Sequence, residues 1–196
     1  MDNQQIKWSE NVILVDGDFI DKVAFDLIVN FERIIGRRIP QADIARWIDC
    51  IAMDGGLRPG LHQTQVVLVH NKQNAQMENF TPGNYDKDLN GKAFKDNLGE
   101  FTISSFPVEK IVKKEDFLAD ILQTVTDKEE VKRVMVVTNE ECYQLMAQVL
   151  HYVDDDSKRI TLFAMQPMPG GNFRQEILGY SLMSALGIKS EEIKTE

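Results

Sequence analysis

The chain has 196 residues, of which 43% are hydrophobic and 27% are charged, with a formal net charge of -9. This mixture excludes an intrinsically disordered chain, and 12 glycines and 6 prolines are too few for a collagen-like or low-complexity protein. No apolar run approaches the roughly 20 residues that span a bilayer. The opening segment, 1–10, lacks the basic and apolar regions of a secretory signal.

These properties lead us to expect a single domain over residues 1–188, followed by a charged tail over 189–196. We expect no membrane partner and a cytoplasmic location, where Cys50 and Cys142 need not pair. The acidic balance also disfavours avid, non-specific binding of nucleic acid, because such binding depends on neutralising phosphates.

The first half of the chain predicts strands and helices in alternation. Consecutive apolar residues in 11–16 predict a strand that is buried on both faces. Apolar residues then recur at helical spacing from Asp21 to a stop at Gly36. Pro40 is placed to open a second helix, which ends at the glycine pair 55–56.

The middle of the chain is less regular. Residues 64–70 predict a second buried strand, and the polar stretch 71–97 predicts a long excursion with one short helix near Met77. Residues 100–106 predict an extended segment with Phe101 and Ile103 on one face.

The second half returns to the alternating pattern. Helices are predicted over 115–126, over 140–152 and near 173–186, and buried strands over 133–137 and 160–164. Strands that are apolar on both faces and alternate with helices predict an α/β fold, a three-layer α/β/α sandwich with a mostly parallel sheet.

Acidic residues follow the ends of the predicted strands, where ligands bind in open parallel sheets. Asp16 and Asp18 follow the first strand, and Glu140 follows the strand over 133–137. Asp116 and Asp120 are one helical turn apart on the helix before that strand. Carboxylates that converge repel one another unless they are protonated, solvated or bridged by a divalent cation such as Mg²⁺ or Mn²⁺.

A simpler interpretation exists for each acid. Asp18 is the better candidate for a helix cap, which accepts bonds from the first N–H groups of the helix. Asp116 and Asp120 are equally consistent with the solvated face of an amphipathic helix.

Three segments resemble the NYN branch of the PIN-like nuclease superfamily. They are ILVDGDF at 13–19, KKEDFLADIL at 113–122 and VMVVTNEECY at 134–143. The resemblance covers the first strand and residues 113–164, and it extends to an uncharacterised bacterial group of NYN-like proteins. It implies a PIN-like, NYN-type sandwich.

The resemblance also implies site residues. Asp16, Asp116 and Glu140 fall on acidic positions of the family motifs and would hold Mg²⁺ or Mn²⁺, with Asp18 or Asp120 orienting the attacking water. Cys142 falls where the family has a second Asp, and a thiol is a poor ligand for a hard cation.

Two functions therefore stay open. The first is a divergent metal-dependent endoribonuclease whose substrate, as the resemblance implies, is single-stranded RNA, bound weakly. The second is a catalytically inactive PIN-like protein that acts as a protein-interaction module. A second copy of the chain, a homodimer partner, would bind either at a Phe101/Ile103 face or at the 71–100 excursion.

Overall fold

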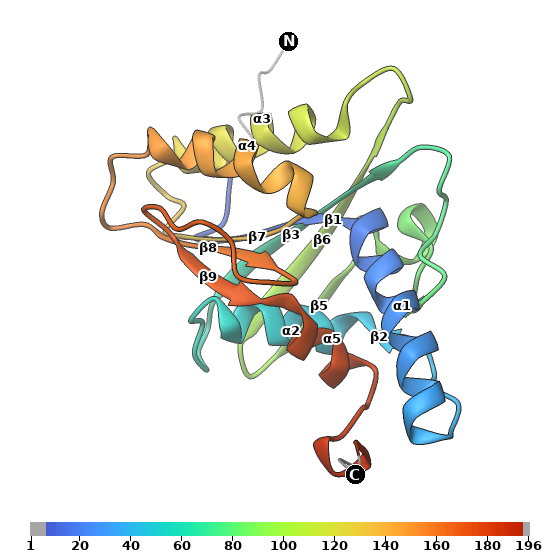
Figure 1. The fold of residues 1–196 in the computed structure, drawn as a ribbon. Coiled ribbons are helices and arrows are strands. Elements are labelled where there is room, and N and C mark those ends of the chain that lie inside the picture. The colour runs from blue at the N-terminus through green and yellow to red at the C-terminus, as the bar shows by residue number, and fades with distance from the viewer. Residues whose placement is uncertain (1–6, 194–196) are drawn as a thin grey trace.

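The computed structural model describes residues 7–193, and a seven-stranded sheet forms its centre (Figure 1). The strands of this sheet are β1 (Asn11–Asp16), β3 (Gln63–Asn71), β5 (Ala93–Asp96), β6 (Gly99–Val108), β7 (Arg133–Val137), β8 (Arg159–Ala164) and β9 (Arg174–Ile177). Their order is β5-β6-β3-β1-β7-β8-β9, and every neighbouring pair is parallel except β5 with β6. Two short strands, β2 (Ala42–Asp43) and β4 (Phe80–Thr81), pair separately.

Helices cover both faces of the sheet, which confirms the predicted three-layer α/β/α sandwich. One face carries α1 (Gly17–Ile35), α2 (Ile44–Asp54) and α5 (Leu178–Ala185), and the other carries α3 (Lys114–Thr126) and α4 (Glu140–His151). Because alternate residues of a strand point to opposite faces, the central strands supply both apolar layers at once. Ile13 and Val15 of β1 pack under α2, while Val12 and Leu14 pack under the α3 layer.

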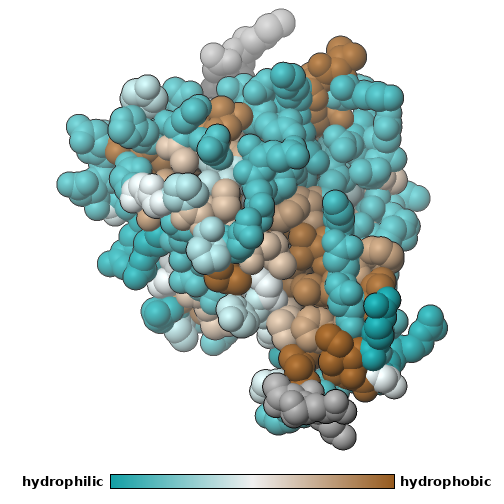
Figure 2. Space-filling view, in the orientation of Figure 1, coloured by the Kyte–Doolittle hydropathy of each residue, from teal (hydrophilic) through white to brown (hydrophobic). Residues whose placement is uncertain are grey.

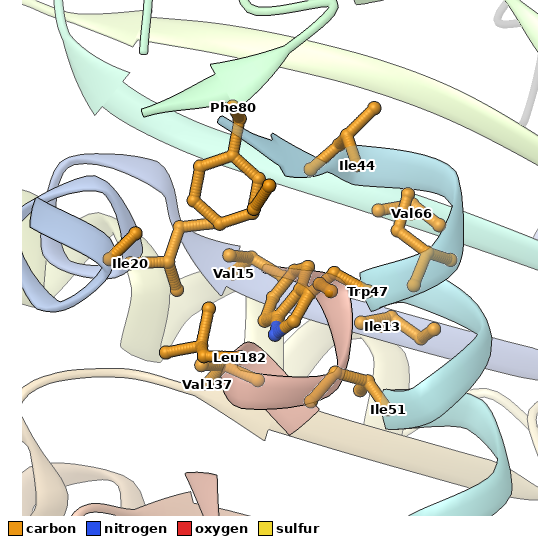
Figure 3. Close-up of a cluster of buried hydrophobic side chains, with 14 of the residues drawn as sticks. Ile13, Val15, Ile20, Ile44, Trp47, Ile51, Val66, Phe80, Val137 and Leu182 are labelled. Carbon is orange, nitrogen blue, oxygen red and sulfur yellow. The ribbon is translucent and has the colours of Figure 1, made fainter. Parts of the chain in front are cut away.

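Trp47 is the largest side chain of the core beneath α2, and it is fully buried (Figure 3). Its ring meets Phe80 edge to face, with centroids 5.9 Å apart. The indole N–H donates to Ser181 Oγ of α5 at 3.2 Å, so the polar atom of this ring keeps a partner after burial. The contact joins three segments that are distant in sequence.

The structure corrects several predicted boundaries. α1 begins at Gly17 rather than Asp21, because Asp16 is already the last extended residue and caps the helix. α2 begins at Ile44, capped by Asp43, and not at Pro40. The helix predicted near 173–186 is instead β9 followed by the short α5, since RQEI pairs with β8 at the edge of the sheet.

The excursion over 71–97 contains no helix near Met77. Instead, Gln76 and Asn84 form an isolated bridge, a single π-helical turn spans Tyr85–Leu89, and β5 follows. β5 also overturns the proposed Phe101/Ile103 docking face, because both side chains are buried. Phe94 of β5 stacks on Phe101 with ring centroids 4.8 Å apart.

Tyr85 of the π-helical turn packs against the start of α1. Its ring stacks on His70 at a centroid distance of 3.7 Å, and it is 1% exposed. A Cβ atom added to Gly17 would clash with Tyr85 Oη, so the absence of a side chain at this position makes room for the tyrosine.

Within residues 7–193, no helix is both long enough and apolar enough to cross a membrane. The expected charged tail is described only as far as Ile193, and Ser190–Glu192 form one 3-10 turn. Residues 1–6 of the opening segment and 194–196 of the tail lie outside the described residues.

Candidate functional site

The carboxyl ends of β1 and β7 are neighbours at the point where the strand order reverses. β3 and β6 lie on one side of β1, and β7, β8 and β9 extend the sheet on the other side. Ligands of open α/β sheets bind at such switch points. Here an open pocket of about 540 Å³ is present, and its polar lining includes Asp16, Asp18, Lys114, Asn139 and Glu140. Three of the five predicted site residues therefore line one pocket.

Asp16 lies at the end of β1 and is 1% exposed. Its Oδ1 atom accepts a bond from the backbone N–H of Phe19 at 3.1 Å, so Asp16 is the N-cap of α1. The sequence prediction gave the capping role to Asp18. That assignment was wrong because the helix starts directly after the strand, which places Asp18 inside its first turn.

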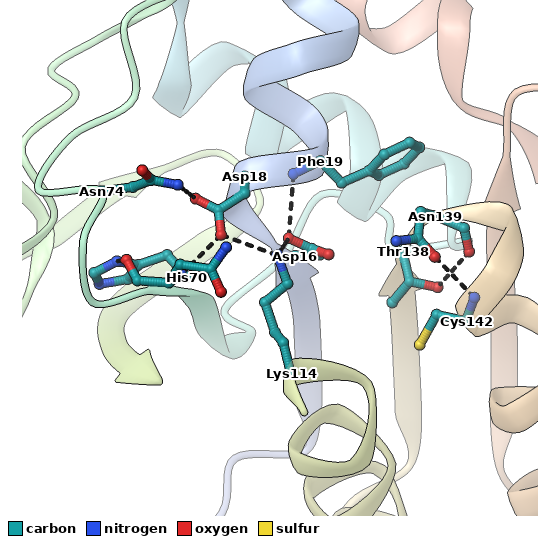
Figure 4. Close-up of polar contacts among 10 residues, drawn as sticks. Asp16, Asp18, Phe19, His70, Asn74, Lys114, Thr138, Asn139 and Cys142 are labelled. Atoms are coloured by element: carbon teal, nitrogen blue, oxygen red, sulfur yellow. Dashed lines mark hydrogen bonds and ion pairs between the residues drawn. The ribbon is translucent and has the colours of Figure 1, made fainter. Parts of the chain in front are cut away.

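Lys114, the first residue of α3, lies between the two aspartates (Figure 4). Its Nζ atom is 2.9 Å from Asp16 Oδ1 and 2.9 Å from Asp18 Oδ2. The lysine side chain is 13% exposed, and those of Asp16 and Asp18 are 2% and 16% exposed. One ammonium group thus bridges two largely buried carboxylates, one of which, Asp16, was expected to bind a metal cation. We call Asp16, Asp18 and Lys114 the ion triad.

Asp18 also anchors the loop that follows β3. Its Oδ2 atom accepts the backbone N–H of Asn71 at 2.7 Å, and its Oδ1 atom accepts the side-chain amide of Asn74, also at 2.7 Å. With Lys114, these donors engage both carboxylate oxygens of Asp18. The carboxylate is therefore a structural junction between α1, α3 and the loop.

Burial and charge shift the pKa values of Asp16 and Lys114 in opposite directions. Burial raises the pKa of Asp16 above its ordinary value, and the charge and hydrogen bond of Lys114 offset only part of that rise. Burial alone would lower the pKa of Lys114, but the charge of Asp16 and the hydrogen bonds to both aspartates raise it overall. The lysine consequently stays protonated at neutral pH.

The other predicted acids are not drawn into the triad. Asp116 and Asp120 are exposed on α3 and do not line the pocket. Glu140, at the start of α4, is exposed at the pocket, and its Oε2 atom accepts the side-chain amide of Gln166 at 3.2 Å. The structure thus separates the predicted metal trio of Asp16, Asp116 and Glu140 between a buried strand end and two exposed helix positions.

The donor set does not suit a hard divalent cation. Mg²⁺ and Mn²⁺ need several free oxygen ligands, but both Asp18 oxygens and Oδ1 of Asp16 already have donors. The second oxygen of Asp16 points toward Thr138 and Asn139 (Figure 4). Among residues 7–193, no group of three or more His, Cys, Asp and Glu side chains is arranged to hold a metal ion.

Cys142 lies at the same end of the sheet, but its thiol is buried and protonated. The thiol is 1% exposed, and burial, with a smaller contribution from the charge of Glu115, raises its pKa to about 12. It is therefore protonated, and it neither replaces an acidic ligand nor acts as a nucleophile at neutral pH. Its backbone N–H donates to Asn139 Oδ1 at 2.8 Å, which makes Asn139 the N-cap of α4.

Lys114 is the residue of the candidate site that the sequence did not reveal. A lysine is not a ligand of a divalent cation, and in the KKED run it is typical of a solvated helix end. One signal in the sequence could have pointed to Lys114. It is the first residue of the helix that follows the long loop, and this loop leaves the carboxyl edge of the sheet.

Comparisons with known proteins add a family but no activity. No curated protein matches the chain at a significant level. Residues 5–193 match a family described as "Family of unknown function (DUF6621)". Because this match spans nearly the whole sequence, the chain belongs to the DUF6621 family.

Proposed function

We propose that this protein is a catalytically inactive, PIN-like binding protein that acts as a protein-interaction module. The observation that carries the proposal is the position of Lys114 Nζ, 2.9 Å from both Asp16 and Asp18. A fixed ammonium group neutralises the carboxylates as a bridging cation would, but it does not generate a hydroxide or coordinate a phosphate oxygen. The triad then stabilises the edge of the sheet without supplying hydrolytic chemistry.

An apolar loop beside the triad supports the interaction role. The segment that joins β6 to α3 carries Ile111, which is 95% exposed, and Val112, which is 46% exposed. Phe106, at the end of β6, is 41% exposed. The loop projects from the upper edge of the molecule, where the surface is hydrophobic (Figure 2). Neighbouring apolar side chains that stay exposed, such as Ile111 and Val112, are typical of protein contact surfaces.

Thermal unfolding with and without millimolar Mn²⁺ tests the first half of the proposal, because a ligand of the native state raises its melting temperature. We expect no rise for the parent protein beyond that given by NaCl at equal ionic strength. Lys114→Ala removes the competing ammonium group and should gain a Mn²⁺-dependent rise. Lys114→Gln serves if the alanine variant does not fold.

The nuclease alternative predicts the opposite results. The parent would then show a Mn²⁺-dependent rise that Asp16→Asn abolishes. It would also cleave single-stranded RNA at low salt in a Mn²⁺-dependent manner, and the same variant would be inactive. Either finding would overturn the proposal. Asp156→Asn, at an exposed position outside the pocket and outside the predicted acidic site, is the matched control for both assays.

The interaction role is tested by replacing the exposed loop side chains. Ile111→Ser with Val112→Ser should leave the melting temperature unchanged, because both residues are exposed. Quantitative affinity capture should then recover a stoichiometric partner with the parent and lose it with the double variant. Equal recovery by both proteins would contradict this assignment of the surface.

A further inference from the structure

Three strands of the sheet begin with arginine. Arg133, Arg159 and Arg174 are the first residues of β7, β8 and β9, which are neighbours in the sheet. Arg133 and Arg159 are directly opposite each other in the β7–β8 register. Arg174 is opposite Thr161, two residues further along β8. The parallel arrangement therefore gathers the three side chains at the amino edge, opposite the edge that holds the ion triad.

A fourth arginine and a glycine turn complete the group. Arg58 follows α2, and its positive charge is among those that act on Arg133. A Cβ atom added to Gly56 would lie 2.9 Å from Arg133 Nη1 and 4.0 Å from Arg174 Nη1. Gly56 has a φ of +93°, a conformation that side chains disfavour, so the glycine both forms the turn and lets the two guanidinium groups approach it.

No described carboxylate forms an ion pair with the cluster. Among residues 7–193, none of these four guanidinium groups lies within 4.0 Å of a carboxylate oxygen. Arg133 Nη1 donates to the carbonyl of Gly55 at 3.0 Å, but its Nε atom is buried and has no hydrogen-bond partner. The negative charge of Glu10 acts on Arg133, but its carboxylate also accepts bonds from His62 and Asn11.

Such a cluster is unexpected in a protein with a net charge of -9. Like charges held together repel, and the repulsion is strongest at Arg133, the one member of the four that is half-buried. A structural role accounts for only part of the group. Arg133 and Arg58 donate to carbonyl groups of the turn, whereas Arg159 and Arg174 are exposed and have no such bond among the described residues. The side chains of Arg159 and Arg174 are therefore available to an external anion.

We propose that Arg58, Arg133, Arg159 and Arg174 form a binding site for a phosphate-bearing ligand at the amino edge of β7–β9. Planar guanidinium groups bind phosphate through paired hydrogen bonds, and several of them together favour a multiply charged anion over a single carboxylate. The site is separate from the ion triad and does not depend on the proposed interaction role.

Inorganic pyrophosphate is the probe, and the full chain is used throughout. At saturation it should raise the melting temperature of the parent by roughly 3–8 °C, measured against NaCl at the same ionic strength. Arg159→Gln with Arg174→Gln should lose most of that rise. Both residues are exposed, so the double variant is expected to fold. Arg38→Gln, an exposed arginine outside the cluster, should keep the full rise.

Isothermal titration of the same proteins checks binding directly. We expect at least a tenfold weaker Kd for the double variant than for the parent and for Arg38→Gln. No binding to the parent, or equal binding by the parent and the double variant, would overturn the proposal. Both outcomes leave the metal and RNA-cleavage tests of the ion triad unaffected.

A labelled single-stranded RNA distinguishes the two sources of phosphate. If the ligand is a nucleic acid, fluorescence anisotropy should show binding that pyrophosphate displaces. The slope of log K against log[salt] should then fall in magnitude by about 1 to 2 in the double variant. If the ligand is a small phosphorylated molecule, pyrophosphate binds and the RNA does not. Both results support the phosphate site, and they assign its occupant differently.

Discussion

The two edges of the sheet handle charge in opposite ways. At the carboxyl edge, Lys114 neutralises Asp16 and Asp18, and backbone and amide donors satisfy the remaining oxygens of Asp18. At the amino edge, four arginines gather without a carboxylate partner within the described residues. The charges of the first group are neutralised within the protein, whereas those of the second have no ion-pair partner among the described residues.

This difference changes where a ligand is expected. General rules for parallel sheets direct attention to the carboxyl edge, and the sequence places its acids there. Yet a charge cluster binds an external ion only when its own charges are unmatched. By that criterion the amino edge is the better candidate, although no motif marked it.

The largest expected effect comes from removing the positive charge of the ion triad. Lys114→Met leaves two buried carboxylates without their counter-charge and should destabilise the protein by about 3–5 kcal/mol. Urea denaturation near neutral pH measures the loss. Lys113→Met, the exposed neighbour, should change the free energy of unfolding by about 0.5 kcal/mol or less. If both variants lose a similarly small amount of unfolding free energy, Lys114 does not neutralise the aspartates at the carboxyl edge.

A second, acidic pair at the amino edge gives the next largest effect. Asp49 of α2 lies beside Asp96, which ends β5 where β6 begins. Burial, followed by the hydrogen bond to and the charge of Asp96, raises the pKa of Asp49 from 3.8 to about 7. The native state therefore holds a proton that the unfolded chain releases, and the free energy of unfolding falls as pH rises from about 4 to 7.

Asp49→Asn should abolish that decline and stabilise the protein at pH 8 by about 1–2 kcal/mol, a figure reduced for solvent screening. Urea denaturation at pH 4.5, 6 and 8 measures the change. Asp120→Asn, which alters an exposed aspartate, should retain the parent's pH dependence. An unchanged profile in Asp49→Asn would show that Asp49 is already ionised in the native protein at low pH.

A smaller effect is expected from a neutral contact at the carboxyl edge. Asn139→Ala removes the side chain that caps α4 and should cost about 1 kcal/mol. Asn139→Ser keeps an acceptor and should recover most of the loss, as measured by thermal unfolding. A full loss in both variants would assign the effect to the pocket lining rather than to the cap.

The smallest effect has the opposite sign. Arg159→Gln with Arg174→Gln removes two unmatched charges and should stabilise the ligand-free protein by about 0.5 kcal/mol or less. The gain should shrink as NaCl is added, because salt already screens the repulsion. Urea denaturation at low and high salt measures it, with Arg38→Gln as the control. Destabilisation by the double substitution would show that internal partners hold these arginines.

Most of the fold was predictable because burial leaves a clear pattern in a parallel sheet. The apolar runs at 11–16 and 133–137 became β1 and β7 with the expected bounds. β9 was missed because RQEI lies at an exposed edge, where no apolar pattern is required. β5 was missed for a similar reason, since only one side of its short sequence meets the core.

The candidate site was predictable only in part. Asp16 and Asp18 could be placed because they directly follow a strong strand signal. Whether charges at a site are matched depends on contacts between distant segments, such as the 96 residues that separate Asp18 from Lys114. The sequence contains one sign of the arginine cluster, because β7, β8 and β9 each begin with arginine. Only the order of strands in the sheet shows that these positions are neighbours.

The contact between Gly17 and Tyr85 constrains how this family can vary. There is room for one aromatic ring and no second side chain, so volume can be exchanged between the two positions but not added. A homologue with alanine or a larger residue at the position of Gly17 must therefore carry something smaller than tyrosine opposite it. The fit of Tyr85 against Gly17 thus limits which pairs of residues can join the excursion to α1.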